Sequence, residues 1–575
     1  MTDSSAPAAA NLPAWAQELS HKYYSRTFAV FVLHGNVHDL VPNGAGDYVP
    51  LARFLNESLF ARRELVLSYD RGGGIAFAKP DMQADFSAAL GGYDSFHGTN
   101  YVRGLPRNPD AVLGLLDNYL RLRIQDHRKL ALTIDFAETI APAGDVSMMS
   151  AEDRNALVIL KRWAQSPLLL QADVTICLIA ENKSDLNPGL VQHPGVAALE
   201  VPLPDESDRA AFIRAELAAR PLPAGSETGV DLLAKLTAGL KRIQIQSLIA
   251  AATESRQPLT MRVVLDRKKE VIEAECAGML EFVQSRFNLS NVAGLTEAKT
   301  RLQNAATAIH ASRTEVLPMG YVVCGPVGTG KTFLVTCFAG EVGIPAVTLK
   351  NFRSMWQGVT EGNLERVLAL LKAMSPIAVI VDEADAQLGD RSSDGDSGVS
   401  NRVFAQIAQF MGNTELRGKV VWFLLTCRPD LLPVDLKRQG RAEEHLALFY
   451  PESGEERRAL LRAMLRKSAS KVAADDIEAL FADTSLALSG ADIEAILTRA
   501  RMKSALEGDA DVDAADVRAA LEDFVPPSYP TEIELQTLVA VLECTSKSLL
   551  PVRFRNMDRA EIVRRVEALK SLVRD

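Results

Sequence analysis

The chain has 575 residues, of which 47% are hydrophobic and 24% charged, and its formal net charge is -10. This length exceeds what a single hydrophobic core supports, so several domains are expected. The acidic balance argues against a general nucleic-acid or anionic-membrane binder, and no apolar run approaches the length of a membrane span.

The six cysteines are dispersed and form no Cys-x-x-Cys pair. This distribution indicates neither a zinc site nor a disulfide framework, and it favours a reducing, cytoplasmic setting. The beginning of the sequence lacks a basic segment followed by an apolar core, so no signal peptide is expected. Its Ala, Pro and Ser content predicts a disordered tail over residues 1–18.

Strands and helices alternate through the N-terminal half of the chain. The predicted strands span residues 28–33, 64–69, 130–134 and 174–179, and the predicted helices span 12–25, 109–126 and 150–166. This alternation predicts an α/β fold in which helices cover both faces of a parallel sheet.

Two patterns in this half could suggest a ligand site. Residues 71–74 form a Gly-rich segment after a predicted strand, but no Lys-Ser or Lys-Thr follows, so a plain turn is expected. His34 and His38 lie four positions apart on a strand-to-turn segment, with only Asp39 as a carboxylate beside them. We interpret them as polar turn residues rather than as metal ligands.

The two halves of the chain share an internal repeat. A predicted apolar strand ends at Asp135 in the first half and at Asp382 in the second, and a similar acidic segment follows at Pro204 and at Pro451. The distance from Asp to Pro is 69 positions in both halves (135 to 204 and 382 to 451). The repeat predicts tandem copies of one parallel-sheet architecture, each followed by a small helical lid.

The repeat and the changes in composition together predict the domain organisation. The expected parts are a first module with a linker over residues 19–290, a second module over 291–526 and a helical C-terminal extension over 527–575. In the second module the core is expected to reach about residue 452, and the lid to span 453–526.

The second module contains a predicted phosphate-binding loop. A predicted strand at 321–324 leads into Gly325, Pro326, Val327, Gly328, Thr329, Gly330, Lys331 and Thr332, and a helix is predicted from Lys331. This stretch fits G-x-x-x-x-G-K-[ST], in which backbone N–H groups at a helix N-terminus bind phosphate oxygens. Lys331 is expected to reach the β- and γ-phosphates of ATP, and Thr332 is expected to bind Mg²⁺.

Two carboxylates follow the next apolar strand of this module, at Asp382 and Glu383. Asp382 is expected to hold Mg²⁺ with Thr332, and Glu383 to polarise the attacking water. Because phosphoryl transfer depends mainly on positioning and charge neutralisation, these carboxylates and Lys331 predict ATP hydrolysis. The first module has Phe136 at the position of Glu383, so no hydrolysis is expected there.

The second module resembles the AAA family of ATPases over about residues 290–505. The resemblance lies in GPVGTGKT, VIVDEAD, LLTCRPDLL, RQGR and LSGAD, which occur in that order. It is similar to the valosin-containing-protein and FtsH types, and the linker more weakly resembles the chloroplast reading-frame class. The first module resembles an AAA module without its catalytic residues.

The resemblance implies further site residues and a ring, usually a hexamer. The adenine pocket would be lined by Ala293, Gly294, Gly490 and Ala491. Arg441, and with it Arg438, would act as fingers toward the ATP of the next subunit; the alternative is that both are solvated charges. Two departures stand out: Cys427 replaces the usual Asn that senses the γ-phosphate, and Glu444 replaces a second finger arginine.

Met355 and Trp356 resemble the pore loop with which such rings grip polypeptide; the alternative for Trp356 is burial against the lid. An ATP-driven unfoldase or remodeller acting on protein substrates or complexes is therefore expected. The alternative is a nucleotide-dependent assembly scaffold with slow turnover. Nucleic-acid translocation is disfavoured by the acidic balance. The sequence has no His-Glu-x-x-His protease motif.

Overall fold

The computed structural model describes residues 12–44, 46–226, 229–276, 278–283, 285, 287–311, 313–350, 361–388, 399–467, 477–478, 481, 488–507, 512–525 and 529–574. The chain forms two compact units, Met1–Ile272 with Val359–Ala373 and Glu273–Gly358 with Met374–Asp575. None of the helices in the described ranges is both long and apolar enough to cross a membrane.

The first unit is built on a sheet that, among the described residues, has six strands in the order β5-β4-β6-β7-β1-β8. All neighbours pair in parallel except β5, which is antiparallel to β4. The strands are β1 (Val30–Gly35), β4 (Leu65–Asp70), β5 (Gly74–Phe77), β6 (Leu130–Ile134), β7 (Val174–Ile179) and β8 (Val196–Val201). The four strands predicted from the sequence are confirmed, while β5 and β8 were not predicted.

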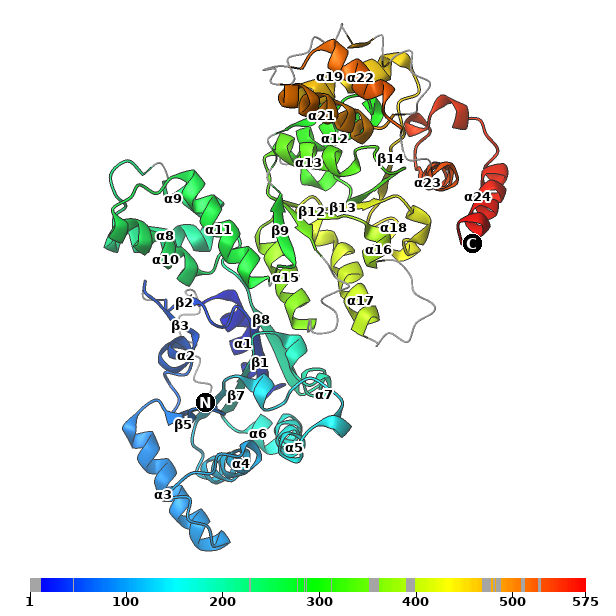
Figure 1. The fold of residues 1–575 in the computed structure, drawn as a ribbon. Coiled ribbons are helices and arrows are strands. Elements are labelled where there is room, and N and C mark those ends of the chain that lie inside the picture. The colour runs from blue at the N-terminus through cyan, green and yellow to red at the C-terminus, as the bar shows by residue number, and fades with distance from the viewer. Residues whose placement is uncertain are drawn as a thin grey trace. The chain divides into compact units, whose positions relative to one another are not determined.

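Helices surround this sheet, and a hairpin and a lid complete the unit (Figure 1). The helices before the lid are α1 (Ala14–Tyr24), α2 (Leu51–Phe54), α3 (Pro80–His97), α4 (Pro109–Gln125), α5 (Ala151–Gln165), α6 (Pro167–Gln171) and α7 (Pro188–Val191). The hairpin is β2 (Leu40–Pro42) with β3 (Tyr48–Pro50), and the lid is α8 (Glu206–Ala219), α9 (Val230–Leu236), α10 (Arg242–Ser255) and α11 (Met261–Glu275). Helix α1 confirms the helix predicted over residues 12–25, whereas the expectation that residues 14–18 belong to a disordered tail is wrong, because Trp15, Ala16 and Leu19 are buried in the core.

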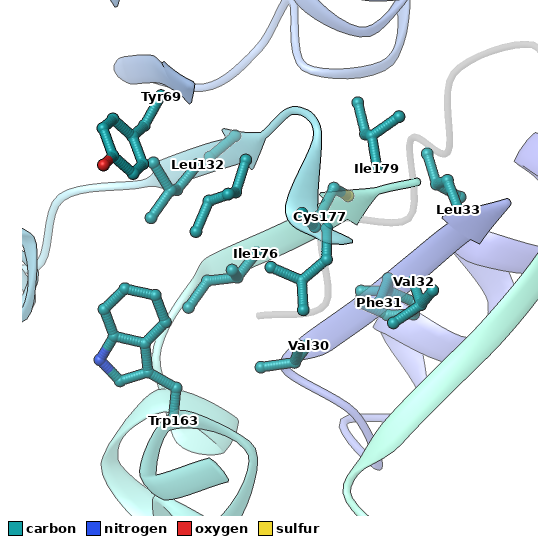
Figure 2. Close-up of a cluster of buried hydrophobic side chains, with 14 of the residues drawn as sticks. Val30, Phe31, Val32, Leu33, Tyr69, Leu132, Trp163, Ile176, Cys177 and Ile179 are labelled. Atoms are coloured by element: carbon teal, nitrogen blue, oxygen red, sulfur yellow. The ribbon is translucent and has the colours of Figure 1, made fainter. Parts of the chain in front are cut away.

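The core of the first unit lies between the central strands and the helices packed on them. Figure 2 shows side chains of β1, β6 and β7 gathered with Trp163 of α5. Strands β6 and β7 are apolar along their whole length and buried at every position, as expected for parallel strands covered on both faces. Trp163 is fully buried, and its indole Nε1 donates a 2.8 Å hydrogen bond to Asp117, which satisfies its polar group inside the core.

The second unit has a sheet with the strand order β14-β10-β13-β12-β11-β9 in its described part. The strands are β9 (Leu280–Val283), β10 (Gly320–Cys324), β11 (Ala346–Leu349), β12 (Ile377–Val381), β13 (Val420–Thr426) and β14 (Glu444–Ala447). Strand β9 is antiparallel to β11, and the other neighbours are parallel.

The helices of this unit form core, lid and extension. Those of the core are α12 (Thr296–His310), α13 (Lys331–Val342), α16 (Ala384–Leu388), α17 (Val399–Met411) and α18 (Val434–Lys437). The lid contains α19 (Gly454–Lys467), α21 (Gly490–Glu507) and α22 (Ala514–Glu522), and the C-terminal extension contains α23 (Pro530–Glu543) and α24 (Arg559–Arg574). Helix α15 (Glu361–Ala373) connects β11 to β12 in the sequence and is grouped with the first unit.

The two sheets repeat one strand order, which confirms the predicted tandem architecture. Strands β8, β1, β7, β6 and β4 of the first unit correspond in order to β14, β10, β13, β12 and β11 of the second, and each sheet ends in an antiparallel edge strand. Gly35 and Gly325, at the ends of corresponding strands, both have positive φ (96° and 144°). A Cβ at Gly35 would lie 2.7 Å from Val201 O, and one at Gly325 would lie 2.1 Å from Leu448 O.

Candidate active site

The phosphate loop follows the buried strand β10 and ends at the N-terminus of α13. Gly325, Gly328 and Gly330 all have positive φ, which favours glycine over residues with a side chain. A Cβ at Gly328 would lie 2.9 Å from Ser489 Oγ at the start of the lid helix α21. The loop therefore passes close to the lid, and the N-terminus of α13 provides the partial positive charge that suits a phosphate.

Lys331 is the first residue of α13, and its side chain folds back over the loop. Its Nζ donates to Gly325 O at 2.8 Å, to Pro326 O at 3.0 Å and to Cys427 Sγ at 3.1 Å. Cys427 follows β13, the strand that pairs with β10. The cation therefore lies between the loop and the residue expected to sense the γ-phosphate.

The two carboxylates lie beside the start of α13. Thr332 Oγ1 donates a 3.0 Å hydrogen bond to Asp382 Oδ2, and Asp382 Oδ1 accepts one of 2.9 Å from the backbone N–H of Glu383. The hydroxyl and carboxylate oxygens are hard donors of the kind that Mg²⁺ prefers, so this pair fits the ion. Glu383 has a φ of 49° and an exposed side chain, which is compatible with access to a water.

A cavity of about 740 Å³ lies beside the loop and is lined by Gly328, Thr329 and Gly330. It is also lined by the four residues expected at the adenine, namely Ala293, Gly294, Gly490 and Ala491. Segment 548–552 and Arg555 of the C-terminal extension form another part of its wall. The sequence alone does not predict this part of the wall, because the apolar Pro-containing run 549–552 is typical of packing rather than of nucleotide binding.

Three parts of the chain match known protein families. Residues 321–450 match the ATPase family associated with various cellular activities (AAA). Residues 6–202 match the N-terminal Rossmann-like domain of AAA+ chaperones, and residues 207–277 match the second helical domain of AAA+ chaperones. By these matches residues 321–450 form an AAA domain, and residues 6–202 and 207–277 form domains of the AAA+ chaperone type. The predicted resemblance to the AAA family is thereby confirmed.

Individual AAA relatives match different shares of the chain. It is 27% identical to the Cell division cycle protein 48 homolog of Archaeoglobus fulgidus, over 64% of this chain and 54% of that protein. It is 33% identical to the ATP-dependent zinc metalloprotease FtsH 3 of Sphaerobacter thermophilus, over 41% and 49%. It is 25% identical to the uncharacterized AAA domain-containing protein ycf46 of Guillardia theta, over 75% and 82%. The chain thus spans about half the length of the first two relatives.

The arginines expected to act as AAA fingers lie after α18 and contact Asp435. Arg441 Nη1 donates to Asp435 O at 2.7 Å, and Arg438 Nε donates to Asp435 Oδ1 at 3.2 Å. The side chain of Arg441 is 14% exposed and that of Arg438 is 56% exposed. Arg441 is therefore held in place within its own subunit, while Arg438 is largely solvated.

Glu444, which stands where AAA proteins commonly have a second finger arginine, has a structural partner. It forms an ion pair with Arg301 of α12, and Arg301 Nη2 also donates to Ser546 Oγ at 2.6 Å. The carboxylate thus joins the sheet edge, α12 and the C-terminal extension. The pore-loop candidates Met355 and Trp356 lie outside the described residues.

The first AAA-like module has no phosphate loop at the corresponding position. Instead, Asp39 is 2% exposed, and its oxygens accept from the N–H groups of Arg242 and Ile243 at 3.0 Å each and from Asn36 Nδ2 at 2.8 Å. Arg242 is the first residue of the lid helix α10. The N-terminus of this lid helix is therefore capped by a carboxylate of the chain itself.

Phe136 and the turn at 71–74 are two further features of this module. Phe136 has a φ of 50°, close to the 49° of Glu383, and its ring stacks on His38 with centroids 5.8 Å apart. The expected plain turn at 71–74 is confirmed, because it closes the antiparallel β4–β5 hairpin and Asp70 Oδ1 accepts from Gly72 N at 2.8 Å.

Proposed function

We propose that this protein hydrolyses ATP in its second module and uses that cycle to remodel protein substrates or complexes as a homo-oligomeric ring. The observation that carries the proposal is the direct bond between Thr332 Oγ1 and Asp382 Oδ2, beside Lys331 and Glu383. It brings the loop and the strand-end carboxylate together, and residues 328–330 of the same loop line a cavity of about 740 Å³.

Each residue of the site has a proposed part in the reaction. The loop N–H groups bind phosphate oxygens, and Lys331 exchanges its contacts with the loop for the β- and γ-phosphates. Glu383 orients a water whose oxygen bonds to the γ-phosphorus while the bond to the β,γ-bridging oxygen breaks, and the proton passes to Glu383. Thr332 and Asp382 would hold Mg²⁺, which neutralises charge on the phosphates when bound.

The ring is proposed because the two arginines that the family resemblance assigns to the γ-phosphate contact Asp435 of α18 in the described structure. These are Arg441 and Arg438. In AAA proteins the corresponding arginines serve the neighbouring subunit, and a hexamer is the usual closed form. We further propose a reducing cytoplasmic setting, supported by six cysteines that form no disulfide.

An assembly scaffold with slow turnover is the second candidate. It is favoured by Cys427, whose thiol is a weaker donor than the usual amide, and by a first module without catalytic residues. In both candidates ATP binds the second module. They differ in whether hydrolysis does work on a substrate.

The test compares the wild-type protein with Lys331→Ala and Glu383→Gln. Lys331→Ala should lose nucleotide binding, and Glu383→Gln should bind ATP without releasing phosphate. Normal phosphate release in either folded variant would remove the catalytic assignment. Proteins captured by the ATP-bound Glu383→Gln form, and absent when Lys331→Ala is used, would identify the substrate of a remodeller.

A further inference from the structure

The C-terminal extension, residues 529–574, packs on the catalytic core of its own unit. Helices α23 and α24 bury their apolar faces against each other, and α23 lies beside β14 (Figure 1). The buried cluster consists of Leu535, Leu538, Val539, Val541, Phe554, Ile562, Val566 and Leu569, with Phe449 packed against it. The apolar face of the last helix therefore packs within the chain, and it fixes α23 next to the phosphate loop.

One polar side chain of α23 reaches the phosphate loop itself. Gln536 Oε1 accepts a 3.0 Å hydrogen bond from the backbone N–H of Val327. Gln536 is only 8% exposed, although it is polar and lies on a helix that could have turned it to solvent. Its Nε2 donates to Glu532 Oε1 at 3.1 Å, so the amide oxygen is directed to the loop.

The carbonyl of the same loop residue is held from the other side. Tyr450 Oη donates to Val327 O at 2.5 Å, from the segment that joins β14 to the lid. Burial, together with the nearby Asp492 carboxylate, raises the pKa of Tyr450 to about 12, so the hydroxyl keeps its proton at neutral pH. Both polar groups of Val327 are thus fixed, one by the core-to-lid junction and one by the extension.

The extension also contacts the cavity and the strand end that carries Cys427. Segment 548–552 lines the cavity. Glu532 Oε1 lies 4.0 Å from Nη1 of Arg428, the residue after Cys427, and Lys570 Nζ lies 3.0 Å from Asp430 Oδ2. Gln536 and segment 548–552 therefore contact the candidate nucleotide site, and Glu532 and Lys570 contact the segment that follows Cys427.

We propose that Gln536 is a positioning residue of the phosphate loop, and that the C-terminal extension is therefore an integral part of the nucleotide site. The inference rests on the proposed function of that site. The hydrogen bond to Val327 holds the tip of the loop, so the N–H groups that follow it are already oriented when a nucleotide arrives. Less ordering is then needed on binding, which tightens binding of any nucleotide that carries a β-phosphate.

The test measures ADP affinity, because ADP occupies the loop without turnover. Gln536→Met keeps the length of the side chain and removes the acceptor, while Gln536→Asn keeps the amide but shortens its reach. Loss of one neutral hydrogen bond should raise the Kd for ADP about fivefold in both variants. ATP hydrolysis should show a similar rise in KM and a smaller change in kcat. Hydrogen exchange at the Val327 amide should become faster.

The matched control is Thr537→Ala in the same helix, since Thr537 Oγ1 donates a 2.7 Å hydrogen bond to Ile533 O within that helix. This variant should retain the wild-type Kd and exchange rate. The proposal is overturned if ADP affinity in Gln536→Met and Gln536→Asn stays within about twofold of the control, whether or not their melting temperatures fall. If Gln536→Met fails to fold, Gln536→Asn and the exchange rate of Val327 decide.

The same measurements separate this inference from the proposed function. If Lys331→Ala loses ADP binding while both Gln536 variants keep it, only the positioning role fails. If Lys331→Ala binds ADP normally, the site assignment itself fails.

Discussion

Lys331 Nζ lies 3.1 Å from Cys427 Sγ, so the loop lysine and the residue at the sensor position are in direct contact. Asparagine at 427 would offer an oxygen to the lysine and an N–H donor to the attacking water, whereas a thiol is weak in both roles. We expect Cys427→Asn to preserve kcat or to raise it by up to about fivefold, the value of one hydrogen bond. Phosphate-release rates and melting curves measure this. A large loss of turnover in a folded protein would instead indicate that Cys427 is required for packing.

Arg441 is expected to act on the ATP of a neighbouring subunit. Arg441→Ala should therefore bind ATP normally and lose at least about tenfold in kcat, since arginine fingers contribute strongly to phosphoryl transfer. Mixing it with Lys331→Ala subunits should restore part of the activity, because some interfaces then combine an intact loop with an intact finger. Arg438→Ala is the comparison, and its more exposed side chain predicts a smaller loss. Rings that exchange subunits but show no rescue would contradict the shared site.

The first module is expected to bind no nucleotide, because Asp39 already caps its lid helix. Purified wild-type protein should bind one ATP per chain, and Lys331→Ala should bind none, by calorimetry and chromatography. A second nucleotide per chain would disprove this.

The Asp39 cap itself should be a stabilising feature of the first unit. Asp39→Ala removes both acceptors from the start of α10 and should lower the free energy of unfolding by about 1–3 kcal/mol. Asp208→Ala is the matched control, because Asp208 pairs with the same Arg242 but is 49% exposed. Its effect should stay below about 1 kcal/mol. Denaturant titrations measure both losses. An equal loss of unfolding free energy in the two variants would contradict a stabilising role of the cap.

The pair of His445 and Glu543 should make the docking of the extension depend on pH. Burial disfavours the imidazolium, but the hydrogen bond and charge of Glu543 outweigh it and raise the pKa of His445 above 6.5. Burial also opposes ionisation of Glu543, yet its bonds to His445 and Lys437 lower its pKa below 4.5. The histidine contribution is complete below pH 6.5 and is lost as the pH rises through the raised pKa; the glutamate contribution is present above pH 4.5 and is lost as the pH falls.

The stability that Glu543→Gln removes should therefore be largest between about pH 4.5 and 6.5, and smaller at pH 8. Part of it should persist at pH 8, because Lys437 Nζ lies 2.8 Å from Glu543 Oε2. Thermal melts of both proteins across this range provide the measurement. A difference that is constant with pH would rule out titration of His445 as its source.

Substitution of Trp356 distinguishes a ring that threads polypeptide from an assembly scaffold. If it grips polypeptide, Trp356→Ala should retain ATPase activity and assembly but lose remodelling of the captured substrate. If it is buried, the same change should cost about 3–5 kcal/mol of stability. A stable, ATPase-active variant that still remodels its substrate would count against both readings and favour the scaffold.

Much of the fold and the phosphate loop could be predicted because their determinants are local. Residues 325–332 are contiguous, and a strand before them and a helix after them define the loop. The strands β6, β7 and β12 are apolar runs followed by polar residues, so their positions could be predicted from the sequence. The repeat of strand order followed from equal spacing after Asp135 and Asp382, since insertions would have disturbed it.

Only the tertiary structure decided which distant polar groups meet. Gln536 is 209 positions from Val327, and Arg242 is 203 positions from Asp39. A glutamine in an amphipathic helix has the same local pattern whether it faces solvent or a loop, because one hydrogen bond leaves no periodicity in the sequence. Likewise, the sequence shows only that Glu444 replaces a finger arginine, whereas the structure shows that Glu444 forms an ion pair with Arg301. The sequence by itself therefore determined the chemistry of the loop and the carboxylates, whereas packing determined which side chains hold that chemistry in place.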